Sequence, residues 1–137
     1  QGLVSNKGAW LGGDAELVFV GDFFDRGPYA IEALDFVMGL QAEAAAAGGA
    51  VEALLGNHDL LTLCSVTFQG QFAAIQQANG GSTQALRRVT PAHLRWLSER
   101  PAMLRAGDRL IVPADTTRYL RYRRTAARAN HRVRTTL

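Results

Sequence analysis

The chain has 137 residues, 47% of them hydrophobic and 20% charged, so it is long and apolar enough to bury the core of a single domain. This composition excludes a disordered polypeptide, and no apolar run approaches the roughly 20 residues that span a bilayer, so we expect no membrane partner. The only cysteine, Cys64, cannot form an internal disulfide, which agrees with a reducing compartment and leads us to expect a cytoplasmic protein.

The first half of the chain predicts a strand, a helix and a second strand. Residues 16–20 and 51–55 are short apolar strands. Between them, Pro28 suits the first turn of a helix, apolar residues follow at helical spacing, and Gly48 and Gly49 end the helix. A strand–helix–strand unit of this length makes the two strands parallel with a right-handed crossover, so the fold class is α/β.

The second half predicts helices and a hairpin. Residues 60–77 read as one helix, and residues 79–82 interrupt it. Thr90 and Pro91 are the cap and first turn of another helix, which ends at Pro101. Residues 103–105 and 109–112 predict a β-hairpin, and Thr125 is expected to cap a final basic helix.

The net charge of +3 is unevenly distributed, because residues 116–137 hold seven arginines and no acidic residue. A basic helical tail of this kind can contact nucleic acid or another anionic surface. It can equally be a solvated helix face, which we favour because no aromatic stacking platform or nucleic-acid motif accompanies the arginines. Nucleic acid is therefore kept only as an alternative partner.

Two motifs carry the chemistry: Gly-Asp-Phe-Phe-Asp-Arg-Gly at residues 21–27 and Gly-Asn-His-Asp at residues 56–59. Each directly follows a predicted strand, and the carboxyl ends of parallel strands meet at one edge of a sheet, where ligands bind in open α/β folds. Either motif alone could be a polar turn. Together, after the two strands of one unit, they predict a site.

The residue types in these motifs suit a metal ion and a phosphate group. The Asp22 carboxylate and the Asn57 amide oxygen are ligands that Mn, Fe or Zn accept, and a pair of such metals can activate water beside a phosphoryl group. Arg26 can hold phosphate oxygens bidentately, and His58 can protonate a leaving oxygen. Asp59 could hold the His58 ring in one tautomer, and Asp25 could orient either Arg26 or His58.

With these residues in place, the sequence resembles the calcineurin-like metallophosphoesterases, and most closely their phosphoprotein (serine/threonine) phosphatase branch. The resemblance implies a four-layer α/β/β/α sandwich, present here in part, with two divalent metal ions. It implies that Asp22 bridges the metals and that Asn57 binds the second metal and phosphate. It further implies that His58 is the general acid with Asp59 as its partner, and that Arg26 contacts the phosphate of a phosphoprotein or small phosphoester.

Three features depart from the family pattern. No Asp-x-His-Gly precedes the first motif, Pro113 stands after the apolar run where a ligand histidine is usual, and no Gly-His pair occurs. We interpret His93 and His131 as surface or capping residues, and Asp115 is the only nearby residue that could replace the missing ligand. We therefore expect half a metal centre in this chain, and little or no turnover by these 137 residues alone.

Two explanations stay open for the missing motifs. The first residue is not methionine, which favours an incomplete domain within a longer protein, whereas Pro113 favours a decayed homologue. The main hypothesis is metal-dependent hydrolysis of phosphate esters. The alternative is a non-catalytic protein that still binds phosphate.

Overall fold

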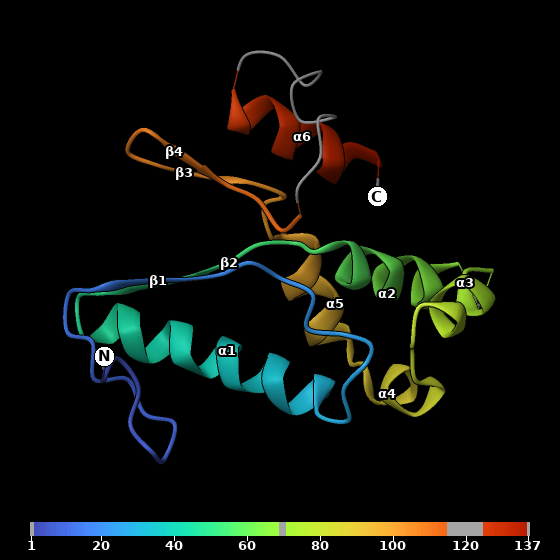
Figure 1. Ribbon diagram of the computed structural model, residues 1–137, viewed down its shortest axis with the longest axis horizontal. Helices are drawn as coiled ribbons and strands as arrows, with labels where there is room; N and C mark the ends of the chain where they lie inside the picture. The colour runs from blue at the N-terminus through green and yellow to red at the C-terminus, as the bar shows by residue number, and fades with distance from the viewer. Residues whose placement is uncertain (1, 69–70, 115–124, 137) are drawn as a thin grey trace.

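A computed structural model of the chain describes residues 2–68, 71–114 and 125–136, with side chains up to residue 131. Its first half is the predicted strand–helix–strand unit (Figure 1). Strand β1 (Glu16–Phe19) precedes helix α1 (Ala30–Ala46) and strand β2 (Ala50–Ala53). The two strands are parallel, with Glu16 opposite Ala50 and Phe19 opposite Ala53. The prediction of a parallel pair is confirmed.

Helix α1 holds this unit together because its buried residues recur every three or four positions and face the sheet. They are Ala30, Ile31, Leu34, Val37, Leu40 and Ala44. The helix ends just before Gly48, whose φ of +83° is easily adopted only by glycine. Pro28 was expected inside the first turn, but α1 begins at Ala30 after the N-cap Tyr29, so the proline belongs to the loop that enters the helix.

The prediction of one helix over residues 60–77 is wrong. Helix α2 (Asn57–Thr67) starts three residues earlier and ends at the C-cap Phe68, and α3 (Ala73–Ala78) is a separate short helix. The β-branched Val66 and Thr67 weaken the helix where it ends. Helix α4 (Thr83–Arg88) was not predicted; Ser82 caps it by accepting a hydrogen bond from the Ala85 amide.

The remaining elements agree with prediction. Thr90 caps α5 (Pro91–Ser98), and β3 (Leu104–Ala106) pairs antiparallel with β4 (Arg109–Ile111). The side chain of Thr125 accepts a hydrogen bond from the Arg128 amide at the start of α6 (Ala126–Thr136). Asn130 of α6 bonds to the backbone of Ala102 and Met103, which attaches this helix to the start of the hairpin.

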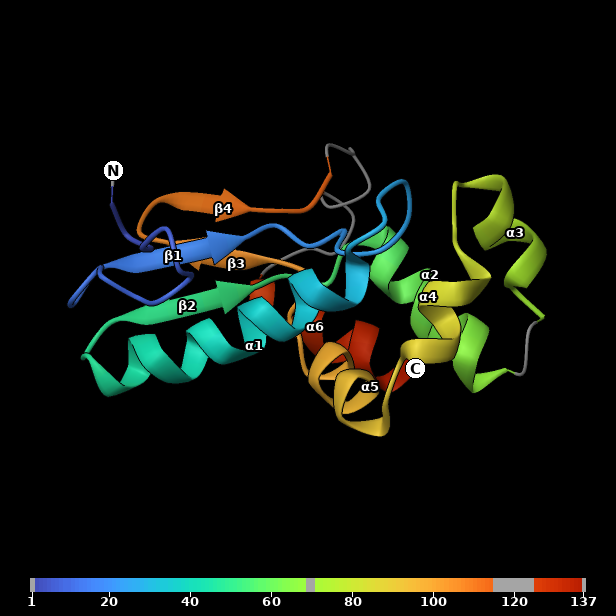
Figure 2. The same ribbon diagram turned by 90° about the horizontal axis from the view of Figure 1, so that it is seen from below.

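The elements are layered around α1 and the β1–β2 pair. Figure 1 shows α1 along one side of the two strands and the β3–β4 hairpin on the other, with α2 and α5 beyond the carboxyl ends of the strands. Figure 2 shows β1 and β2 side by side, with both arrowheads pointing toward α2. One core cluster lies under α2 and α5 around Leu34 and Leu97, and a second lies under the strands around Leu40 and Val51. The described sheets thus form part of an α/β sandwich.

Within the described residues, no helix combines the length and the apolar composition needed to cross a membrane.

Candidate active site

The two motif loops touch at the carboxyl ends of β1 and β2. A Cβ atom on Gly21 would lie 2.5 Å from the Gly56 nitrogen and 2.6 Å from the Leu54 carbonyl oxygen. Because real Cβ atoms do not approach a backbone so closely, and because Gly21 has a φ of +84°, only glycine fits there. The glycine of the first motif therefore lets the second motif pack directly against it.

The first loop contains unusual backbone geometry. Asp22, Asp25 and Arg26 have φ values of 59°, 71° and 59°, and they are the only described non-glycine residues with positive φ. Such conformations cost on the order of 1–2 kcal/mol each for ordinary residues and persist where the surroundings fix them, often at functional sites. These backbone conformations set the directions of the charged side chains of Asp22, Asp25 and Arg26.

Asp59 fixes the position of the loops. Its carboxylate accepts hydrogen bonds from the amides of Asp22 (2.8 Å), Phe23 (2.8 Å) and Gly56 (2.9 Å). Burial raises the pKa of the Asp59 carboxyl above its usual range, and the three amides oppose that rise by favouring the ionised form. The prediction that Asp59 holds the His58 ring is therefore wrong. The side chains of adjacent helix residues point about 100° apart, and the Asp59 carboxylate accepts a hydrogen bond from Gly56, the N-cap of α2.

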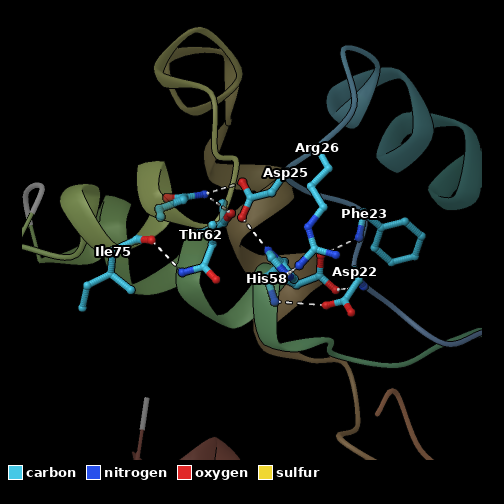
Figure 3. A network of polar contacts seen from close by, with 10 residues as sticks. Asp22, Phe23, Asp25, Arg26, His58, Thr62 and Ile75 are labelled. Atoms are coloured by element: carbon cyan, nitrogen blue, oxygen red, sulfur yellow. Dashed lines mark hydrogen bonds and ion pairs between the residues drawn. The ribbon is translucent and has the colours of Figure 1, made fainter.

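Asp22 connects the same loops from the other side. Its Oδ1 accepts a hydrogen bond from the His58 amide at 3.0 Å, which places the Asp22 carboxylate against the first turn of α2 (Figure 3). Asn57 is the first residue of that helix and is exposed. The structure therefore brings Asp22 and the Asn57 position to the same edge of the sheet, as the spacing of the motifs predicts.

The His58 ring is held at both nitrogen atoms. Its Nδ1 lies 2.7 Å from Oδ2 of Asp25 and its Nε2 lies 3.0 Å from Nη2 of Arg26 (Figure 3). Because arginine only donates, Nε2 accepts, and Nδ1 therefore carries the proton that it donates to Asp25. The His58 and Asp25 side chains are 6% and 2% exposed, whereas Arg26 is exposed. The ring is thus contacted by a buried carboxylate at Nδ1 and by an exposed guanidinium at Nε2.

Two residues of the site carry no signal in the sequence. Gln76 of α3 donates to Asp25 at 3.2 Å, and the carbonyl of Gly80 accepts from the Arg26 amide at 2.9 Å. Gln76 belongs to a stretch that resembles any polar helix, and Gly80 to an ordinary helix-terminating turn. Only the folded arrangement of α3 against α2 reveals their contacts.

The described donors do not complete a metal site. No group of three or more histidine, cysteine, aspartate or glutamate side chains suitable for a metal occurs in residues 2–68, 71–114 and 125–131. Pro113 follows β4 and offers no ligand atom. The expected replacement, Asp115, lies outside the described residues. Of the expected metal ligands, this part of the chain places the Asp22 carboxylate and the Asn57 position at the edge.

The other two histidines lie on α5 and α6. His93 is a capping residue, as predicted, since its Nδ1 accepts from the Thr90 amide; it is not a surface residue, because it is 6% exposed and its Nε2 lies 2.8 Å from Oδ1 of Asp35. His131 is exposed on α6.

A parallel β1–β2 pair, the two motif loops at its carboxyl edge and a buried Asp–His pair define a phosphoesterase-type α/β protein. The family model of calcineurin-like phosphoesterases matches residues 11–115. The chain belongs to the calcineurin-like phosphoesterase family.

Several relatives are similar over part of their length. The chain is 37% identical over 62 residues to Shewanella-like protein phosphatase 2 of Arabidopsis thaliana, which is 45% of this chain and 16% of that protein. It is 35% identical over 98 residues to the symmetrical bis(5'-nucleosyl)-tetraphosphatase of Methylococcus capsulatus, which is 72% of this chain and 32% of that protein. The chain thus spans less than a third of these relatives.

A solved structure shows the same fold over nearly the whole chain. The cold-active protein-tyrosine phosphatase of a psychrophilic Shewanella species superimposes with a TM-score of 0.74 at 25% identity. The match covers 98% of this chain and 42% of that protein. The described architecture is therefore part of a larger phosphatase fold, which agrees with the predicted partial sandwich.

Proposed function

We propose that the natural polypeptide carrying this sequence hydrolyses phosphate esters in a metal-dependent reaction, and that this chain supplies the proton donor and a phosphate contact. The observation that carries the proposal is the His58 ring held between Asp25 and Arg26, beside Asp22 at the sheet edge. Family membership supports the reaction class.

Each residue has a distinct role in this proposal. Arg26 binds phosphate oxygens, and its exposure lets the guanidinium reach a substrate. Once Arg26 has moved away, His58 takes up a proton at Nε2 from solvent; Asp25 stabilises the charged ring through Nδ1, and Nε2 then donates that proton to the departing oxygen. Asp59 keeps both loops together through three backbone amides.

Arg26 also controls access to the histidine. Its Nη2 occupies the position where Nε2 would contact a leaving oxygen. A bound phosphate competes for the guanidinium, because a charge-assisted bidentate contact is stronger than a single bond to neutral imidazole. Substrate binding would therefore withdraw Arg26 and open Nε2 for protonation.

Membership of the family indicates that metal ions are required. A complete metal site needs more ligands than the described residues provide. Asp22 and Asn57 are the residues here that would hold divalent ions such as Mn, Fe or Zn, with further ligands from elsewhere. Such ions supply a water-derived nucleophile and neutralise charge on the phosphoryl group. The steps assigned to Arg26, His58 and Asp25 do not pass through a metal.

The substrate class follows the names of the relatives, which include protein phosphatases and a dinucleoside tetraphosphatase. A phosphoprotein or a small phosphoester is therefore the proposed substrate.

The test is hydrolysis of phenyl phosphate, whose leaving group needs a proton, by the natural polypeptide with added Mn²⁺. We expect turnover that falls strongly in His58→Ala and is unchanged in His131→Ala, which alters an exposed histidine far along the chain. Equal rates for the wild type and His58→Ala would refute the role of His58.

A second candidate is a non-catalytic protein that binds phosphate through Arg26. It is favoured by one observation, the lack of a complete donor group among the described residues. Metal analysis of the natural polypeptide separates the two, since a stoichiometric pair of bound metals supports the hydrolase.

A further inference from the structure

Gln76 is a buried polar residue to which the proposed reaction assigns no role. It lies in α3 and is 1% exposed. Its Nε2 donates to Oδ1 of Asp25 at 3.2 Å and to Oγ1 of Thr62 at 2.8 Å. Asp25 therefore uses one oxygen for Gln76 and the other for His58.

The orientation of the Gln76 amide is dictated by its neighbours. An ionised carboxylate only accepts hydrogen bonds, so the amide must turn its nitrogen toward Asp25. The opposite atom, Oε1, is then buried with no hydrogen-bond partner. A buried acceptor is rarely left unpaired. The Gln76 amide thus leaves Oε1 unpaired while its N–H groups donate to Asp25 and Thr62.

The loop after α3 holds Gln76 in place and reaches the other partner of His58. The Gly81 amide donates to the Gln76 carbonyl at 2.8 Å, and a Cβ on Gly81 would lie 2.7 Å from that oxygen. The Gly80 carbonyl accepts from the Arg26 amide. The segment from Gln76 to Gly81 therefore contacts both residues that hold the imidazole, since Gln76 donates to Asp25 and Gly80 accepts from Arg26.

We propose that Gln76 is a positioning residue, which fixes the Asp25 carboxylate so that Asp25 holds the His58 ring in the Nδ1–H tautomer. It acts through Asp25 and does not touch the substrate. This inference deepens the proposed function and rests on it for its catalytic meaning, while the contact itself can be tested without turnover.

The test follows the Nδ1 proton of His58 by NMR in the natural polypeptide labelled with ¹⁵N-histidine. The His58→Gln variant identifies that signal by its loss. In the wild type we expect a protected Nδ1–H signal. In Gln76→Leu we expect its exchange with water to rise about tenfold, as the loss of one hydrogen bond predicts. Gln77→Leu is the matched control, because Gln77 is the exposed neighbour on the same helix, and it should leave the signal unchanged.

A second variant covers the case in which the leucine variant does not fold. Gln76→Met keeps the length of the side chain but has no hydrogen-bond donor for Asp25, so it should raise the exchange in the same way. In the natural polypeptide, both Gln76 variants should lower kcat by about tenfold with KM nearly unchanged.

The outcomes separate this inference from the proposed function. Unchanged Nδ1–H exchange in both Gln76 variants would overturn the positioning role, even if the wild type hydrolyses phosphate esters. Increased exchange in a protein that hydrolyses no phosphate ester would support the contact and refute the proposed function alone.

Discussion

The Nδ1 atom of His58 lies 2.7 Å from Oδ2 of Asp25, a residue 33 positions earlier in the chain, and both side chains are almost completely buried. The parallel pairing of β1 and β2 makes this contact possible, since it brings the two motif loops to one edge. The same contact fixes the ring so that Nε2 faces the exposed Arg26.

Asp25→Asn should impair hydrolysis without unfolding the protein. The amide cannot stabilise the protonated ring as a carboxylate does, so we expect kcat to fall roughly 100-fold or more. Steady-state kinetics of the natural polypeptide with phenyl phosphate, whose leaving group depends on the proton, measure this effect.

The chain provides a matched control in Asp35→Asn. Asp35 lies 2.8 Å from His93 in a similar aspartate–histidine pair, but this pair belongs to the cap of α5. We expect no effect on kcat. An equal loss in both variants would show that the effect on kcat comes from general destabilisation.

Arg26→Lys should weaken the binding of phosphate. A lysine keeps the charge but loses the bidentate geometry, and a charge-assisted hydrogen bond contributes enough that we expect about tenfold weaker inhibition by inorganic phosphate. Arg88→Lys is the control, because Arg88 forms an exposed ion pair with Glu32 and such pairs contribute little. Unchanged inhibition in Arg26→Lys would remove Arg26 from the phosphate site.

Asp59→Ala should destabilise the fold. Three backbone amides would lose their common acceptor, and we expect the free energy of unfolding to fall by about 3 kcal/mol. Urea denaturation measures this change, with the exposed Asp14→Ala expected to stay within about 0.5 kcal/mol of the wild type. A loss as small as that of Asp14→Ala would contradict the role given to Asp59.

Cys64 should react slowly with alkylating agents. Burial raises the pKa of its thiol, so the folded protein holds less of the reactive thiolate at a given pH than a free cysteine does. We expect the midpoint of the pH profile of iodoacetamide alkylation to lie at a higher pH in the folded protein than in the same protein unfolded in urea. A midpoint for the folded protein at the same pH or at a lower pH than for the unfolded protein would contradict the raised pKa.

The sequence predicts the parts of the fold that depend on local pattern. The apolar runs and glycine stops around α1 define the parallel unit, and Thr90 and Thr125 mark helix starts as expected. The break between α2 and α3 was missed because apolar residues keep a helical spacing across it, although the β-branched Val66 and Thr67 weaken the helix where it ends.

Motif spacing predicted which two loops meet, but not all of the contacts between them. Motif spacing placed Asp22 and His58 together because parallel strands end at one edge. Adjacency in sequence suggested Asp59 as the partner of His58, whereas helix geometry gives that contact to Asp25. The contribution of Gln76 depends on packing between helices, which no local pattern reveals.

The role of His58 as proton donor is tested most directly by the dependence of the rate on the leaving group. The measurement compares kcat/KM for phenyl phosphate and p-nitrophenyl phosphate in the natural polypeptide and its His58→Ala variant, with Mn²⁺ present. Phenolate is the poorer leaving group and needs the proton more, so the variant should lose much more activity with phenyl phosphate. An equal loss with both substrates would contradict proton donation by His58.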